Sequence, residues 1–481
     1  MDLRPVGYVI GLLVAVLGAA MLLPMIVDLA EGRGHWFVFA ECAMITLVIG
    51  GALSLSCANS VREGLTIQQT FLLTTGVWLA LPVFGALPFW FGATEARYVD
   101  AFFEAMSGLT TTGSTVLSGL EELPKGLLLW RGILQWLGGI GIIVVAMVFL
   151  PELRVGGMQI FRTAAFDTFG KILPRATEIA SRISVIYLAL TLICALCYIG
   201  AGMDAFDATV HAMTTIATGG FANYDASFAA FGPAASYVAS VFMILAALPF
   251  VRFVQLSAGT ARPLLQDTQI HVFLVTAFAV VLLIALANVI RTETVTEPAL
   301  RTALFNTVSL MTGTGYANAD YMQWGGFAVA VLFFTGLIGG CAGSTACSIK
   351  VFRYQLLFAS IRAQLQKTRS PHGIFTPRYA GRPVGEDVLN SVMSFFMFFV
   401  VTLGVLSVAL AMTGLDFVTS ISGAATALAN IGPGFGDQIG PAGNFAGLND
   451  TAKWLLSAAM LIGRLELMAV YVIFTVGFWR A

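Results

Sequence analysis

Long apolar runs recur along the whole chain and are separated by shorter polar segments. Ten of these runs have about 20 residues, the length that crosses a bilayer as a helix. They lie near residues 7–29, 36–58, 71–92, 129–150, 184–203, 234–251, 271–290, 326–349, 388–413 and 454–478. Composition agrees, because 58% of the residues are hydrophobic and only 11% are charged, whereas soluble domains carry about 25% charged residues. The pattern predicts an all-α polytopic membrane protein.

The polar segments between the runs differ in charge according to their side. On one side, 152–182, 251–270 and 350–386 hold fourteen Lys and Arg residues. The segments on the other side hold four Lys and Arg residues and fourteen Asp and Glu residues; they are 93–128, 204–232, 291–325 and 414–452. Because Lys and Arg accumulate on the cytoplasmic side, we expect the first set and both termini in the cytoplasm. The acids of the second set are expected to concentrate cations in an outer vestibule.

Four short segments on the outer side carry glycine preceded by threonine or glycine. They are Thr110–Ser114, Ala217–Phe221, Thr312–Tyr316 and Ile431–Phe435, and we align them on Gly113, Gly220, Gly315 and Gly434. Each lies between two predicted spans, so one unit is repeated four times. In the first unit, Asp100 to Thr110 would form a helix of about 16 Å, too short to span, with Asp100 as its N-cap.

These repeats predict a cation pathway. Irregular backbone at membrane depth is tolerated only where protein surrounds it or water fills a cavity. Four such segments can meet on one axis, where carbonyl oxygens replace the hydration shell of a cation and the half-helix C-termini favour it. Four copies in register outweigh the alternative of close helix packing through small residues. The predicted filter residues are Thr111, Thr112, Gly113, Thr218, Gly219, Gly220, Gly313, Thr314, Gly315, Ile431, Gly432, Pro433 and Gly434.

The position nine residues before the aligned glycine is polar in three of the four repeats. It holds Glu104, His211 and Asn306, with Ala425 in the fourth. We expect these side chains to tie the half-helices to their surroundings rather than to bind ions.

Two further features lie inside predicted spans. The eighth span contains a run of small residues that weakens a helix: Gly339, Gly340, Cys341, Ala342, Gly343 and Ser344. The run is consistent either with a tight helix crossing or with an unwound segment. Arg464 lies in the middle of the last span, where a charge costs at least ~2.5–3.5 kcal/mol and needs a partner or a water-filled cavity. Glu466 is one candidate partner, although residues two apart do not share a helix face. We expect Arg131, near the outer end of its span, to snorkel to the surface, with no role in the ion pathway.

With its four glycine-bearing segments, the sequence resembles the superfamily of K+ transporters that includes TrkH and KtrB, and the resemblance covers the whole chain. It implies two N-terminal helices (1–65), as in the TrkH branch, and four pore repeats (66–160, 161–262, 263–370 and 371–481). It also implies K+ uptake through a channel-like pore, K+ at the filter carbonyls, and a gate formed by an intramembrane loop (336–349) with Arg464. The implied setting is the bacterial inner membrane. The implied partners are a second copy of the chain and a cytosolic ring of nucleotide-binding TrkA-like subunits.

Other classes of function are less consistent with the sequence. A cation-coupled secondary transporter, such as a K+/H+ or Na+-linked symporter, also uses broken helices, but it usually has two inverted repeats rather than four parallel ones. An intramembrane enzyme would need a Ser–His or paired-Asp constellation within the spans, so we predict that the protein is not an enzyme. The chain carries no nucleotide-binding motif, and we expect neither a cofactor nor a nucleic-acid partner. Cys194 and Cys197 have C-x-x-C spacing inside an apolar span, where packing is the better interpretation.

Overall fold

The protein is described by a computed structural model that covers residues 2–32, 34–60, 65–146, 156–158, 160 and 176–480. Within these ranges, seven helices are long and apolar enough to cross a membrane, and there are up to nine such spans if each of two sharply bent helix pairs counts as one. This is the all-α, multi-span architecture that the hydrophobic runs predict. The only strands in the described residues are two of two residues each, β1 (Arg378–Tyr379) and β2 (Arg382–Pro383).

The chain begins with a helical hairpin. It consists of α1 (Arg4–Ala20), continued by α2 (Leu22–Ala30), and α3 (Trp36–Cys57). The two helices approach closely at Gly11 and Gly50, because a Cβ on Gly11 would lie 2.8 Å from the Gly50 carbonyl oxygen. Small residues therefore allow the backbones of the hairpin to touch, as is common in membrane helices.

The same order of elements then follows four times: a long helix, a short half-helix and a second long or broken helix. The elements are α4 (Ile67–Gly85) with α5 (Leu87–Phe91), α6 (Tyr98–Leu109) and α7 (Lys125–Val144); α10 (Ala176–Gly200), α11 (Ala205–Ile216) and α12 (Pro233–Ala246) with α13 (Phe250–Ser257); α15 (Thr268–Thr292), α16 (Glu297–Thr312) and α17 (Gly326–Gly336); and α19 (Glu386–Met412), α20 (Phe417–Ala429) and α21 (Asp450–Arg464) with α22 (Leu467–Tyr471).

The half-helices begin with the caps that helix physics favours, except in the first repeat. The side chains of Asp204, Thr296 and Asp416 cap α11, α16 and α20 by accepting a hydrogen bond from the first turn. The prediction that Asp100 caps the first half-helix is wrong, because α6 already begins at Tyr98. Asp100 instead lies inside the first turn, where a carboxylate still interacts favourably with the helix dipole.

Three of the four inner helices are interrupted. The chain bends by 90° between α12 and α13 and by 109° between α21 and α22. In the third repeat α17 ends at Gly336, and residues 337–350 form an irregular segment, which we call the loop, before α18 (Val351–Arg369) begins. A continuous helix over 326–349 is therefore not formed, and a tight helix crossing at this run of small residues is excluded.

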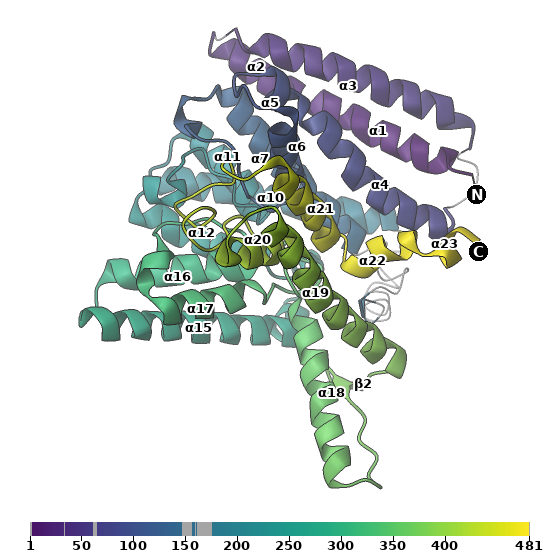
Figure 1. The fold of residues 1–481 in the computed structure, drawn as a ribbon, viewed down its shortest axis with the longest axis vertical. Coiled ribbons are helices and arrows are strands. Elements are labelled where there is room, and N and C mark those ends of the chain that lie inside the picture. Colours follow the sequence, from purple (N-terminus) through teal and green to yellow (C-terminus); the bar gives the residue numbers. More distant parts are fainter. Residues whose placement is uncertain are drawn as a thin grey trace.

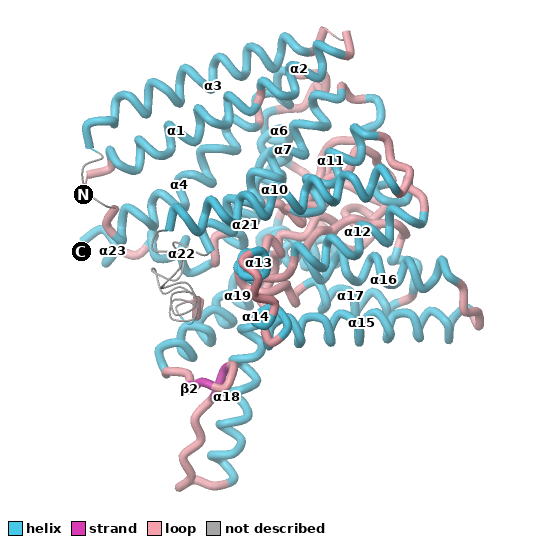
Figure 2. Tube along the Cα trace, turned by 180° about the vertical axis from the view of Figure 1, so that it is seen from behind, coloured by secondary structure: helices cyan, strands magenta, loops and turns pink. Residues whose placement is uncertain are grey.

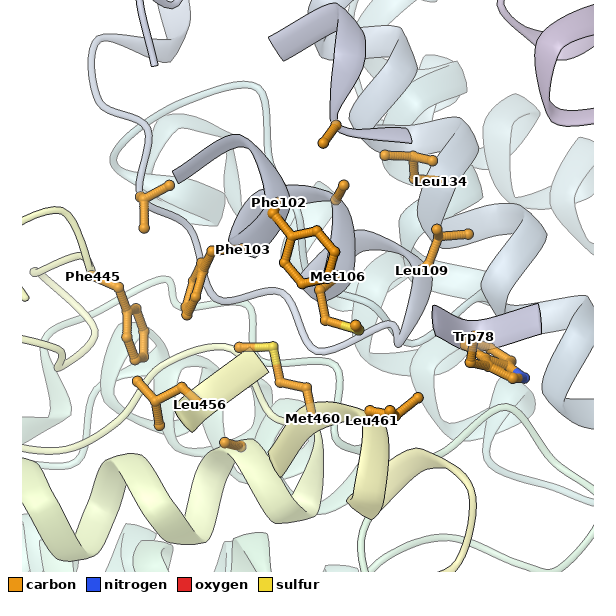
Figure 3. Packing of buried hydrophobic residues seen from close by; sticks show 14 of the residues in the cluster. Trp78, Phe102, Phe103, Met106, Leu109, Leu134, Phe445, Leu456, Met460 and Leu461 are labelled. Atoms are coloured by element: carbon orange, nitrogen blue, oxygen red, sulfur yellow. The ribbon is translucent and has the colours of Figure 1, made fainter. Parts of the chain in front are cut away.

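The repeats surround a common centre, and two parts extend away from it. Figure 1 shows the N-terminal hairpin along one edge of the molecule and α15, α16 and α17 at the opposite edge, with α18 projecting beyond the rest. Figure 2 shows from behind that the N- and C-termini lie near each other. The first and fourth repeats meet at α6 and α21, where Met106 faces Met460 and Phe103 packs on Phe445 with ring centroids 5.5 Å apart (Figure 3).

Candidate ion pathway

All four half-helices end in the same backbone conformation. The first or second residue after the helix lies in the left-handed region, with φ of 51° at Thr111, 50° at Thr218, 77° at Gly313 and 52° at Asn430. In three repeats the next N–H donates to the carbonyl five residues earlier, as Thr112 does to Ser107 at 2.8 Å. This is the hydrogen bond of a Schellman cap, which closes a helix and turns the chain back. This geometry explains Gly313 and Asn430, which adopt it readily, whereas the β-branched Thr111 and Thr218 are strained there.

The left-handed residue also fixes the register of the repeats. A glycine lies two residues after it in every repeat, at Gly113, Gly220, Gly315 and Gly432. The sequence alignment placed Gly434 at this position, and the structure corrects it to Gly432. Gly434 lies outside the turn, and its N–H donates to the Ile439 carbonyl at 2.6 Å. The alignment failed because Gly-Pro-Gly offers two glycines, and only the helix end shows which one is equivalent.

These four residues, which we call the ring glycines, touch one another in a closed ring. A Cβ on Gly113 would overlap the Gly219 carbonyl oxygen, and one on Gly220 would overlap the Thr314 carbonyl oxygen. A Cβ on Gly315 would lie 2.7 Å from the Gly432 nitrogen, and one on Gly432 would lie 2.9 Å from the Gly113 carbonyl oxygen. The contacts of each repeat are with the backbone of the next, so no side chain can move aside to accommodate a Cβ. Backbone therefore lines the point where the four repeats meet.

A cavity of about 490 Å³, which we call the vestibule, opens above the ring. It is lined by all four ring glycines and by segments that follow them, including residues 114–115, 220–222 and 438–445. Among the described residues that line it, Asp225 is the one acid and Arg131 the one base. Apart from Asp225, the outer acids therefore do not line this cavity, and their effect on cations at its mouth stays a prediction.

Half of these acids cap helices or form ion pairs. Asp100 accepts from Lys453 Nζ at 2.5 Å, Arg97 pairs with both Asp100 and Asp450, and Asp204 and Asp416 cap half-helices. Asp207 accepts from the Tyr224 hydroxyl at 2.8 Å, which together with partial burial raises the pKa of Tyr224 to about 12 and keeps it a donor. The acids hold the outer ends of the repeats together.

The loop lies at the opposite, inner side of the ring. The Cys347 N–H donates to the Thr312 carbonyl at 3.4 Å, the Cys347 Sγ lies 3.6 Å from Thr111 Oγ1, and the Ser348 N–H donates to the Ala429 carbonyl at 3.0 Å. The loop thus contacts the C-terminal ends of α6, α16 and α20, from which the filter segments start. The predicted loop residues lie in it, and all six are buried: Gly339, Gly340, Cys341, Ala342, Gly343 and Ser344.

The break between α12 and α13 holds the loop from the other side. The Cys341 N–H donates to the Ala247 carbonyl and the Phe250 N–H donates to the Gly343 carbonyl, both at 2.9 Å. The Gln269 side chain accepts from the Ala342 N–H at 3.0 Å. The backbone groups that the bend of the second inner helix exposes are thereby paired with the loop, as buried backbone requires.

Arg464 lies at the end of α21, where the last inner helix bends, rather than in the middle of a helix. Its side chain is 5% exposed, and Nη1 is 2.9 Å from Cys347 Sγ and 3.4 Å from the Thr345 carbonyl oxygen. Nε and Nη2 have no hydrogen-bond partner among the described residues. The alternative of an ion pair with Glu466 is excluded, because Glu466 pairs with Arg353 at 2.5 Å. A buried guanidinium thus points at the loop beneath the ring, with two nitrogens that have no partner in the described part of the chain.

The chain is similar to known proteins. The TrkH family, described as cation transport proteins, matches residues 35–478. The chain is 42% identical to the Trk system potassium uptake protein TrkI of Halomonas elongata, over 99% of this chain and 97% of that protein. It is 36% identical to the Trk system potassium uptake protein TrkH of Escherichia coli K12, over the full length of both. The chain belongs to the TrkH family.

The solved structures agree with this assignment. The crystal structure of the potassium transporter TrkH from Vibrio parahaemolyticus matches with a TM-score of 0.91 at 34% identity, over all of both chains. The resemblance inferred from the glycine-bearing segments is confirmed, and so is the all-α polytopic membrane fold.

Sequence reasoning missed two amides that hold the glycine-bearing segments of this TrkH-family chain. Gln135 of α7 donates to the Gly219 carbonyl at 2.7 Å and accepts from the Phe221 N–H at 3.0 Å. Asn430 donates to Thr112 Oγ1 at 3.1 Å and to the Met460 carbonyl at 2.8 Å. The one feature of the sequence that points to these residues is a side-chain amide among apolar neighbours. Their partners are too far away in the sequence for that signal to name them.

Arg131 also differs from the prediction. It is 2% exposed and does not snorkel, because its guanidinium pairs with the fully buried Glu104 at 2.9 Å. None of the cysteines in the described residues forms a disulfide bond, and Cys194 is buried in the apolar span, which agrees with packing as its role.

Proposed function

We propose that this TrkH-family protein takes up K+ across the cytoplasmic membrane as the ion-translocating subunit of a Trk-type system. The observation that carries the proposal is the closed ring of Gly113, Gly220, Gly315 and Gly432 between an open vestibule and a buried loop. The relatives that share this fold at 34–42% identity are named as potassium uptake or potassium transporter proteins. A backbone-lined constriction offers carbonyl oxygens, the ligands that replace the hydration shell of K+ in a filter.

The proposed filter comprises the predicted residues of the four segments, with Gly432 in place of Gly434 as the fourth ring glycine. The half-helices end at the ring, so the partly negative ends of their dipoles face the pathway and favour a cation there. Four single-glycine segments bind the ion through main-chain atoms only, and no resident metal or cofactor takes part.

The proposed gate is the loop together with Arg464. The loop blocks the inner side of the ring, where it contacts three half-helix ends. Arg464 adds a positive charge directly beneath the ring. A fixed positive charge in a region of low dielectric constant strongly opposes a permeating cation. Opening then requires the loop and Arg464 to move away from the ring together, since Cys347 links them.

The proposed setting is the bacterial inner membrane with both termini in the cytoplasm. On this placement α18 and the β1–β2 hairpin project into the cytoplasm (Figure 1). They carry exposed Arg362, Lys367 and Arg369, a surface suited to a cytosolic regulatory ring of the TrkA type. We also propose that the transporter acts as a homodimer.

The experiment is uptake of 86Rb+ into K+-loaded proteoliposomes that contain the purified protein, with external K+, Na+ and Cs+ as competitors. Block by K+ far better than by Na+ is expected from a K+-preferring pore. Equal block by K+ and Na+ would contradict K+ selection. Uptake that requires an imposed H+ or Na+ gradient would favour a coupled symporter over a channel-like pore. A Gly113→Ala variant is the matched control, because its Cβ overlaps the neighbouring filter segment.

A further inference from the structure

Each filter segment is fastened to its own half-helix by one buried polar side chain. The N–H three residues after each ring glycine donates to this side chain: Val116 to Glu104 Oε2 at 3.0 Å, Asn223 to His211 Nε2 at 3.4 Å, Asn318 to Asn306 Oδ1 at 3.4 Å, and Phe435 to Ser422 Oγ at 3.0 Å. We call Glu104, His211, Asn306 and Ser422 the strap residues. In the fourth repeat the strap is Ser422 and not the aligned Ala425, since the register there differs.

The strap of the first repeat differs in chemistry from the other three. Glu104 carries a charge, and it accepts from Arg131 Nε at 2.9 Å while both side chains are buried. The other three straps are an imidazole, an amide and a hydroxyl. His211 accepts at Nε2, so its proton lies on Nδ1, which donates to the Asp207 carbonyl at 2.8 Å. Only the first strap therefore needs a compensating charge in its surroundings.

Arg131 links the first filter segment to the second. Its Nη2 donates to Thr115 Oγ1 of the first segment at 3.3 Å, and its Nη1 donates to the Ala222 carbonyl of the second at 2.6 Å. The guanidinium also lies 4.1 Å from the centre of the Phe221 ring. The planar fork of an arginine can hold three acceptors and stack on a ring, whereas a lysine ammonium is a single point charge.

The same helix face adds a second attachment one turn further along α7. Gln135 follows Arg131 by four residues, which places both side chains on one face. Gln135 binds the Gly219 carbonyl and the Phe221 N–H. The first inner helix therefore fixes three main-chain groups of the second filter segment and one side chain of the first.

We propose that Glu104 and Arg131 are positioning residues that set the spacing of the first two filter segments, and with it the discrimination between K+ and Na+. This inference rests on the proposed function, because it assigns selectivity to that same filter. The pair has two separable effects. The Arg131 guanidinium holds the backbone in place with its planar set of donors. The Glu104 carboxylate neutralises the guanidinium, so that the pair adds no uncompensated charge to the vestibule that Arg131 lines.

Three variants separate the two effects. Arg131→Lys keeps the charge but loses the fork, so we expect 86Rb+ uptake to continue while preference for K+ over Na+ falls about tenfold, the size of one net hydrogen bond. Glu104→Gln keeps an acceptor for the Val116 N–H but leaves the guanidinium unpaired, so uptake itself should fall. Glu104→Gln with Arg131→Met removes both charges, and it should restore uptake without restoring selectivity.

The control is Arg301→Lys. It changes an Arg–Glu pair on α16, in which Arg301 Nε lies 2.8 Å from the exposed Glu297. It should change neither rate nor selectivity. Equal selectivity in Arg131→Lys, the double variant and the unmodified protein would overturn the proposal and leave the pair a purely structural one. Size-exclusion profiles and melting temperatures identify any variant that fails to fold. If Glu104→Gln fails to fold, Glu104→Asp serves as the conservative replacement.

A second measurement separates this inference from the proposed function. Hydrogen–deuterium exchange over residues 111–118 and 217–224 reports directly on how firmly the two segments are held. We expect faster exchange in both segments for Arg131→Lys and no change for Arg301→Lys. If the unmodified protein does not prefer K+, the proposed function fails while this exchange result still stands. If exchange is unchanged in Arg131→Lys, the positioning role is wrong whatever ion the protein carries.

Discussion

Arg464 and Cys347, 117 residues apart in the sequence, meet beneath the proposed filter with Nη1 2.9 Å from Sγ. Cys347 also lies against Thr111 at the end of the first half-helix. One side chain thus touches both the proposed filter and the buried charge, so movement of either the loop or the last inner helix alters what lies directly under the ring. Four predictions follow from this arrangement and from the packing that supports it.

Removal of the Arg464 charge should raise basal flux. In Arg464→Ala the barrier beneath the filter disappears, so 86Rb+ uptake by the purified protein without a partner should increase. Cys347→Ala should act in the same direction but less strongly, because the charge remains while its contact with the loop is lost. Arg362→Ala, a change to an exposed arginine on α18, is the control and should leave basal flux unchanged. Unaltered flux in Arg464→Ala would contradict its role as a barrier.

The register of the fourth repeat can be tested by two single changes. In Gly432→Ala the new methyl group meets the Gly113 carbonyl oxygen at 2.9 Å, so K+ selectivity should be impaired. In Gly434→Ala it meets mainly the end of the Ile439 side chain, which can move. Competition of K+ and Na+ against 86Rb+ uptake should therefore change much more in the first variant. The reverse order would restore Gly434 as the ring glycine.

The ion pair between Arg353 and Glu466 should be important for stability. Arg353 is 1% exposed, its Nη2 lies 2.5 Å from Glu466 Oε2, and its guanidinium stacks on Phe395 at 3.9 Å. Arg353→Met leaves a largely buried carboxylate unpaired, a change that costs about 3–5 kcal/mol in other proteins. We expect a clear drop in melting temperature, partly recovered in Arg353→Met with Glu466→Gln. If the double variant is no more stable than the single one, the pair is not the cause.

The N-terminal hairpin should be attached through Asp28. This fully buried carboxylate accepts from the Gly126 N–H at 2.6 Å, in the first turn of α7, and pairs with His35 Nδ1 at 2.8 Å. Asp28→Ala leaves the helix N–H without a partner and should cost about 1–3 kcal/mol, measured as a lower melting temperature with K+ preference retained. The exposed Lys125–Glu31 pair nearby is the control, because Lys125→Ala should change stability by less than about 1 kcal/mol.

The sequence by itself determined the membrane-spanning helices and the four glycine-bearing segments, and it marked the run from Gly339 to Ser344 as either a tight helix crossing or an unwound segment. Each depends on residues that are neighbours in the chain, namely a long apolar run, a short amphipathic helix that ends in glycine or threonine, or a cluster of small residues in a span. Local backbone preference and the cost of polar groups in lipid are enough to interpret them.

Only the tertiary structure decided the rest, because it depends on contacts between distant residues. Gly432 rather than Gly434 joins the ring, since Asn430 ends the half-helix and the next repeat touches the glycine two residues later. Arg131 is buried because Glu104, Thr115 and the Ala222 carbonyl surround it, although its place in the sequence predicts an exposed end. Glu466 is unavailable to Arg464 because Arg353, more than a hundred residues earlier, already holds it. A charged or polar side chain in an apolar region requires a partner, and only the packed chain determines which partner it contacts.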